Sequence, residues 1–374
     1  MLISTVALFS VGEFLKPLFG AFIDLDKAAS PQARKELIVI MQLSMMATFL
    51  LAMCFEKPEL IQLAVLFSFC SILTAAHDTA TDGLAVQILK EDEQALGGFG
   101  QYAGSKLGAL IAGGIIPMLV GTNHRLLCAG VLLPMTVVLW YTVQYDLPDF
   151  NPLVVAPDAA PPVNNQNFVL QSLTQCLHSI PAWREALVYF TFKFADHGLD
   201  FLMSPMLVQA HISRATIVQT QFLLSIAAAV LGACVGSYIC NYIKSAPKAL
   251  AICSALRLVP NLMQLWLAYA PLTSYSISFI ATHAVLENVA GSAATGAAFV
   301  VLLQQSDPAN PACSYAVLNT IAVIGSMVGK FSFGQLGHFG GFRAACVVGV
   351  LLNAMFPILS LTFLAPQKKT EKCD

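Results

Sequence analysis

Four ionisable side chains lie close together in the segment TFKFADHGLD, which is otherwise largely apolar. Lys193, Asp196, His197 and Asp200 are spaced i, i+3, i+4 and i+7, so on a helix they form one stripe. Burying an ionisable group in a bilayer costs about 2.5–3.5 kcal/mol or more, so the stripe must face a wet cavity or charged partners. In a cavity the lysine can bind an anion, and the Asp and His side chains can carry protons. The alternative is a set of interhelical salt bridges that only holds helices together.

A second group of ionisable side chains lies in the segment HDTATDG. Asp78 and Asp82 are one helical turn apart and share a face, with His77 beside them. Two carboxylates at this spacing repel each other, which favours a proton on one of them and suits proton coupling. For Asp82 the alternative is an acid at the cytosolic end of its helix.

Three further cations lie inside apolar segments and are candidates for holding an anionic solute. Lys106 is near mid-membrane by the rise of about 1.5 Å per residue. Lys330 is deep in a later segment, and Arg257 is in the cytosolic half of another. Lys16 is expected to reach the interface from a helix end, and His283 to be a packing residue among apolar neighbours. The glycines of LGGFG and GSMVG are expected to permit close helix contact or bending.

The composition indicates which elements must position these side chains. The chain has 374 residues, 57% of them hydrophobic and 11% charged, and its mean hydropathy is +0.72. A soluble domain carries roughly a quarter charged residues, so an all-α, multi-pass membrane protein is predicted. The net charge of −2 argues against nucleic acid as a partner. The ten cysteines are scattered without metal-ligand spacing, so neither a metal nor another cofactor is expected.

Apolar stretches of about 20 residues predict membrane-spanning helices. They cover residues 1–23, 36–55, 59–89, 95–120, 123–144, 184–209, 212–243, 249–270, 276–305, 312–338 and 342–365. The Pro- and Asn-rich stretch 146–183 is predicted to be a linker between bundles of five spans (1–145) and six spans (184–366), with a tail at 367–374. Ten Lys and Arg residues follow the odd-numbered spans or lie in the tail, against four on the other side. This bias predicts a cytosolic linker and C-terminus.

An internal repeat relates the two predicted bundles. Residues 80–89 align without a gap with residues 293–302 at a shift of 213, pairing Gly83 with Gly296. The same shift pairs Tyr102 with Tyr315, so the third and fourth spans match the ninth and tenth. Two parallel halves of six spans, the first lacking one helix, predict the major facilitator fold with about eleven transmembrane helices.

Several segments, in order, carry a family resemblance. They are HDTATDGLAVQIL, GQYAGSKLGALIAGG, YFTFKFADHGLDFLMSPML and LENVAGSAATGAAFVVLL, and KPLFGAFID keeps a Lys-to-Asp spacing at Lys16 and Asp24. Together they resemble the acetyl-coenzyme A transporter and AmpG-type branch of the major facilitator superfamily. Two departures are His77, where the family has Gln, and Ser105, where it has Tyr. The resemblance implies transport of anionic amphiphilic solutes, acetyl-coenzyme A in one branch and muropeptides in the bacterial one.

The sequence therefore predicts a monomeric secondary transporter that works by alternating access in a lipid bilayer, with no catalytic residues. Its substrate is expected to be a small anionic molecule, acetyl-coenzyme A or a related acyl-coenzyme A, with protons as a coupling ion. The expected substrate-binding residues are Lys106, Lys193, Arg257, Lys330, Gln101, Glu287 and Asn288. The expected proton-coupling or charge-balancing residues are His77, Asp78, Asp82, Asp196, His197 and Asp200.

Two other functions stay open at this point. A chain that lacks the first helix would also suit a non-transporting or truncated regulatory form. A membrane acyltransferase would use the H-x4-D pattern of His77 and Asp82. Residues five apart on a straight helix point about 140° away from each other, so this pair does not form a joint catalytic site.

Overall fold

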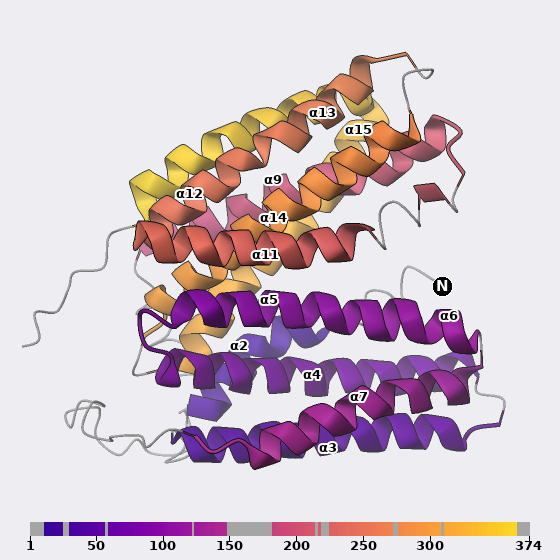
Figure 1. Cartoon of the computed structure of the whole chain (residues 1–374), viewed down its shortest axis with the longest axis vertical. Coiled ribbons are helices and arrows are strands. Elements are labelled where there is room, and N and C mark those ends of the chain that lie inside the picture. The colour runs from indigo at the N-terminus through magenta and orange to yellow at the C-terminus, as the bar shows by residue number, and fades with distance from the viewer. Residues whose placement is uncertain are drawn as a thin grey trace, which may run out of the picture. The chain divides into compact units, whose positions relative to one another are not determined.

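The described part of the chain is mostly helical (Figure 1). The computed structural model describes residues 11–24, 30–56, 59–121, 123–147, 182–213, 216–217, 224–271, 276–307 and 310–364. Each predicted span overlaps a described helix. The predicted tail at 367–374 lies outside the described residues, as does the predicted linker apart from its two ends.

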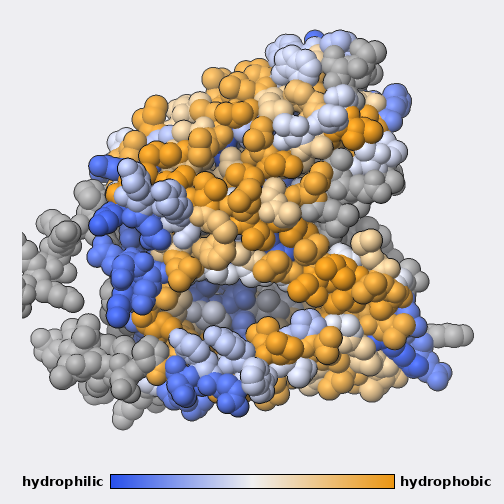
Figure 2. Space-filling view, in the orientation of Figure 1, coloured by the Kyte–Doolittle hydropathy of each residue, from blue (hydrophilic) through white to orange (hydrophobic). Residues whose placement is uncertain are grey.

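The helices are suited to a membrane. Eight of those in the described ranges are long and apolar enough to cross a bilayer. The helix α9 (Ala182–Gln209) is also long, at 28 residues, but carries the charged stripe and stands outside that group. Apolar side chains cover most of the visible face in Figure 2, while hydrophilic ones gather toward the helix ends. The chain is an integral, multi-pass membrane protein.

The described helices belong to two compact units, which we describe separately. Unit 1 comprises Met1–Leu89, Ile111–Ile180 and Ser306–Thr320, and unit 2 comprises Lys90–Leu110, Pro181–Gln305 and Ile321–Asp374. The helix α5 (Gln94–Leu110) therefore groups with the later helices, and the start of α15 (Pro311–Phe363) groups with the early ones. The division into bundles at 1–145 and 184–366 stays a prediction.

Unit 1 is built around α4 (Leu60–Ile88), which packs against α2 (Val11–Asp24) and α3 (Pro31–Cys54). The helix α7 (His124–Gln144) packs on α3. Its ends are fixed by side chains: the Asn123 side-chain oxygen accepts hydrogen bonds from two backbone N–H groups at its start. At the other end, Lys35 Nζ donates to the carbonyls of Val143 and Tyr145, at 3.1 and 2.6 Å.

Unit 2 is built around α14 (Ile277–Gln305), which packs against α5, α11 (Leu224–Ile243) and α12 (Ala246–Leu256). Both α14 and α4 are 29 residues long, and they carry the two copies of the internal repeat. On its other side the unit contains α9 and most of α15. A Cβ atom on Gly325 or Gly329 of α15 would collide with the backbone carbonyl of Phe190 or Phe194 of α9. The glycines of GSMVG thus let two helix backbones touch, as expected.

Two predicted spans differ in detail from the structure. The predicted helix 249–270 breaks at Arg257 into α12 and α13 (Leu258–Tyr269), because Pro260 has no N–H to donate to the carbonyl of Leu256. The predicted helix 95–120 contains a π-helical turn, η2 (Ile111–Ile115), before the short α6 (Ile116–Val120), which has Pro117 in its first turn. The last two predicted spans, 312–338 and 342–365, are confirmed as two helical segments of α15, which meet at the non-helical Gly341, with φ of 79°.

Candidate functional site

A cavity lies inside unit 2, among α5, α9, α11, α14 and the break between α12 and α13. Its volume is about 280 Å³. The four residues of the charged stripe on α9, Lys193, Asp196, His197 and Asp200, all line it. The predicted stripe therefore faces one cavity. The remaining lining residues are Tyr102, Lys106, Met203, Ser225, Arg257, His283, Ala284, Glu287, Asn288, Gly291, Ser292 and Thr295.

The most buried charge in this cavity is the guanidinium of Arg257, which is 4% exposed. It forms ion pairs with Asp196 and Glu287, and its Nη2 lies 3.5 Å from Asp200 Oδ1. We call these four residues the Arg257 group. The break between α12 and α13 places Arg257 where it reaches acids from both α9 and α14. Arg257 was predicted to contact substrate, but its guanidinium is already engaged by three carboxylates.

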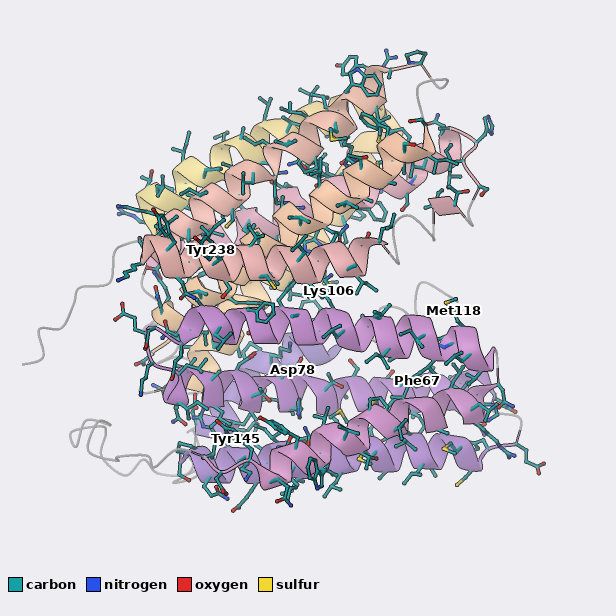
Figure 3. All side chains as sticks on the ribbon, in the orientation of Figure 1. Phe67, Asp78, Lys106, Met118, Tyr145 and Tyr238 are labelled. Atoms are coloured by element: carbon teal, nitrogen blue, oxygen red, sulfur yellow. The ribbon has the colours of Figure 1, made fainter. Side chains whose placement is uncertain are left out.

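The two lysines of the cavity have different partners. Lys193 Nζ donates to Thr295 Oγ1 at 3.2 Å, and Lys106 Nζ lies 5.1 Å from the centre of the Tyr102 ring. In the described part of the chain, no carboxylate lies within 4 Å of either ammonium group. Lys106 projects from α5 and is labelled in Figure 3. These ammonium groups are therefore available to an anion that enters the cavity.

A layer of neutral polar side chains joins the helices around the lysines. Tyr102 of α5 accepts a hydrogen bond from Ser292 of α14 at 3.1 Å. Asn288 of α14 donates to Ser225 of α11 at 3.0 Å. Sequence reasoning named Asn288 and missed the others, although Tyr102 stands one turn before Lys106 on the same helix. That i, i+4 spacing is the signal that would have found it.

The position of His283 corrects an expectation. It was predicted to be a packing residue, and it is buried at 3% exposure, but it also lines the cavity. The carbonyl of Pro260 faces its ring, yet neither ring nitrogen makes a hydrogen bond of standard geometry. His283 lies one turn before Glu287 on α14, which is the sequence signal for its place near the Arg257 group.

Two predicted substrate-binding residues of unit 2 do not line this cavity. Gln101 and Lys330 are both exposed. Lys330 is still near enough to act electrostatically on Lys193 and His197. The roles predicted for Gln101 and Lys330 in binding thus stay predictions.

The other predicted ionisable residues belong to unit 1 and form a separate group. Lys16 is 5% exposed and pairs with Glu13 at 2.9 Å and with Asp78 at 3.4 Å; we call these three residues the Lys16 group. The expectation that Lys16 reaches the interface is wrong, because it lies in the middle of α2 and points to α4. His77 Nε2 lies 3.3 Å from Gln42 Nε2, and Asp82 is buried at 6% exposure. Figure 3 labels Asp78 on α4.

Unit 1 also contains a buried ion pair that includes Asp24, one of the two residues of the Lys-to-Asp spacing noted above. Asp24 and Arg34 are joined at 2.6 Å, with side chains 2% and 1% exposed. The Asp24 carboxylate also accepts hydrogen bonds from the backbone N–H groups of Ala312 and Cys313, at 3.3 and 2.7 Å. It therefore caps the start of α15, where unpaired N–H groups and the helix dipole favour an anion.

Known proteins of similar structure are membrane transporters. The human organic anion transporter MFSD10 (TETRAN) superposes with a TM-score of 0.69 at 14% identity, covering 95% of this chain and 82% of that one. A bacterial homologue of the iron transporter ferroportin in the outward-facing state gives 0.64 at 9% identity, covering 96% and 89%. The same homologue with soaked iron gives 0.65 at 11% identity, with the same coverage. No family model matches the chain. The chain thus has the fold of major facilitator transporters, as predicted.

Proposed function

We propose that this chain is a secondary transporter that moves an anionic amphiphilic solute across a membrane by alternating access. Acetyl-coenzyme A or a related acyl-coenzyme A is the substrate that we propose to test first, with protons as the coupling ion. The chain acts as a monomer and has no catalytic residues in this proposal.

One observation carries the proposal: the ammonium groups of Lys106 and Lys193 face a cavity inside a membrane protein and have no carboxylate partner among the described residues. An unpaired charge in such a place is costly, which argues that a ligand completes the site. Lys106 and Lys193 come from α5 and α9, so an anion between them would bridge two helices. Phosphate groups suit this arrangement because they accept charge-assisted hydrogen bonds from several donors at once.

Further support comes from the sequence resemblance and from the proteins of similar fold. The family resemblance implies an acyl-coenzyme A or another anionic amphiphile, and one protein of similar fold is an organic anion transporter. The Arg257 group has a different place in the mechanism. Because its guanidinium is engaged by acids, we assign Arg257 to holding α9 and α14 together and leave anion binding to the lysines.

The proposal is tested by uptake of radiolabelled acetyl-coenzyme A into liposomes that contain the purified full chain. Lys106→Met and Lys193→Met should each reduce the initial rate about tenfold or more, because a hydrogen bond to a charged group contributes about 1.5–3 kcal/mol. Lys90→Met is the matched control, since Lys90 is exposed and does not line the cavity. It should transport as the wild type does.

A binding measurement separates loss of substrate from loss of transport. Acetyl-coenzyme A should raise the unfolding midpoint of the wild type and of Lys90→Met, and should do so less for the two cavity variants. Wild-type protein that neither binds nor takes up acetyl-coenzyme A would reject this substrate. Uptake that survives in both cavity variants would reject the proposed site.

A further inference from the structure

The Arg257 group contains more negative charge than its own cation can balance. Three carboxylates, those of Asp196, Asp200 and Glu287, surround one guanidinium, and the carboxylate oxygens lie within 4.8 Å of one another. In the described residues, the remaining ion-pair contact to these acids is from His197 to Asp196, at 3.9 Å. Carboxylates so close in a buried site do not all stay ionised.

The three acids are not equivalent. Asp196 is 5% exposed and in contact with Arg257, so its charge is compensated. Asp200 makes a looser contact, with its Oδ1 atom 3.5 Å from Arg257 Nη2, and 41% of its side chain is exposed. Asp200 and Glu287 come from α9 and α14, and their carboxyl groups are close enough for a hydrogen bond between them. Such a bond needs a proton on one of the two.

A separate observation points to the same place. His283, 3% exposed, lines the cavity one turn before Glu287, and its ring nitrogens have no hydrogen bond of standard geometry. Within the described residues, Glu287 Oε2 also makes no hydrogen bond of standard geometry. Burying an imidazole or a carboxylate oxygen without a hydrogen-bond partner costs free energy. A proton that these groups can bind would provide a hydrogen bond and reduce that cost.

Charged and titratable groups from each neighbouring helix of unit 2 face this pair. They are Lys193, Asp196 and His197 on α9, Arg257 between α12 and α13, His283 on α14, and Lys106 and Tyr102 on α5. Lys330 on α15 lies outside the cavity lining and acts electrostatically on Lys193 and His197. Lys193 and Lys106 act electrostatically on Asp200. An anion bound to the lysines would therefore reduce their pull on the carboxylates and strengthen proton binding.

We infer that Asp200 and Glu287 share one exchangeable proton, with His283 as the neighbouring acceptor, and that this is the coupling proton of the transporter. The inference rests on the proposed function for its role in transport, but the proton site itself does not. It reassigns Glu287 from substrate binding to proton binding. It also leaves out Asp196: Arg257 contacts both Asp196 and Glu287, but of these two it is Glu287 that lies within hydrogen-bond reach of Asp200. A metal ion at the centre of the three carboxylates would lie against the guanidinium that already contacts them, so the site takes a proton.

Infrared spectroscopy of the purified full chain in lipid tests this site without any substrate. A protonated carboxyl group has a C=O stretching band distinct from that of a carboxylate. Wild-type protein should show such a band at neutral pH that disappears as the pH is raised. Because the proton is shared, Asp200→Asn and Glu287→Gln should each remove the band.

Asp78→Asn is the matched control, since Asp78 is paired with Lys16 and should not contribute to the band. If an amide variant does not fold, as judged by its unfolding midpoint, Asp200→Glu or Glu287→Asp decides, because either should shift the band without removing it. A wild type without the band at neutral pH, or a band that survives in both amide variants, overturns the inference. A persistent band with no acetyl-coenzyme A uptake would reject the proposed function and leave the proton site standing.

Discussion

The two compact units each contain a buried cation with acids around it, but the acids differ in how far they are exposed to water. In unit 1, Lys16 is 5% exposed and pairs with Glu13 and Asp78, whose side chains are 36% and 42% exposed. In unit 2, Arg257 is 4% exposed and is joined by acids of which two are 12% exposed or less. The same cavity also contains Lys106 and Lys193, which have no carboxylate partner among the described residues.

This difference indicates which group is structural and which belongs to a site. In the Lys16 group, the cation and its acids are adjacent, and water reaches the acids, so the charges compensate one another locally. In unit 2, Lys106 on α5 and Lys193 on α9 line the same cavity as the excess acid, yet among the described residues neither forms an ion pair with it. Charge separated in this way is not needed for stability, and proteins keep such arrangements where a ligand or proton completes them.

The largest expected effect is on the cation at the centre of each group. Arg257→Met leaves two buried carboxylates, Asp196 and Glu287, without their counter-charge and should destabilise the protein by about 3–5 kcal/mol. Lys16→Met leaves two half-exposed acids that water solvates, so its cost should be about 1 kcal/mol or less. Unfolding midpoints of the purified variants in mixed micelles measure both. Equal losses would mean that the two groups have the same structural role.

A smaller loss of stability is expected from a substitution that displaces α9, the helix with the charged stripe. A Cβ atom on Gly329 would meet the carbonyl of Phe194, and neither backbone can yield without shifting α9. Gly329→Ala should therefore cost about 1–3 kcal/mol and reduce uptake. The matched control is Gly100→Ala on α5, where an added Cβ meets nothing within 4 Å. Greater helix propensity should make that variant more stable by about 0.5–1 kcal/mol.

Gly329→Ala can also be combined with Lys16→Met to test whether the two sites contribute independently to stability. The Lys16 group does not include α9, so the difference in stability between Lys16→Met and the wild type should be the same with or without Gly329→Ala. Independent sites add in this way. A strong departure from additivity would show that α9 and the Lys16 group are coupled.

Much of the fold could be predicted from the sequence because the signals are local. Apolar length gave a helix at each predicted span, and the helical spacing of the stripe on α9 put its four side chains on one cavity. The glycines of GSMVG were expected to allow close helix contact, and they do. These predictions depend on periodicity and residue size, which one sequence contains in full.

The partners of the charged residues could not be predicted, because pairing depends on tertiary contacts between distant segments. Lys16 finds Asp78, 62 residues away, and this contact keeps it buried instead of at the interface. The role of Arg257 depends on the helix break that Pro260 causes between α12 and α13. A hydropathy profile shows α12 and α13 as one continuous span. His283 was predicted to be a packing residue because the residues next to it in the sequence are apolar. Its polar neighbour on the helix face, Glu287, is four residues away.

The smallest expected effect has opposite signs in the two units and concerns one histidine in each. His283 is buried without a standard hydrogen bond, so His283→Leu removes an unsatisfied polar group and should stabilise the protein by up to about 1 kcal/mol. His77 has Gln42 at 3.3 Å and Asp78 at 3.6 Å, so His77→Leu should destabilise it by about 0.5–1.5 kcal/mol. Unfolding midpoints give the two signs. If His283→Leu gains stability and also loses proton-dependent uptake, the histidine is retained for function, since nothing in its packing requires an imidazole. If it loses stability as His77→Leu does, His283 is a structural residue and the inferred proton site has one fewer member.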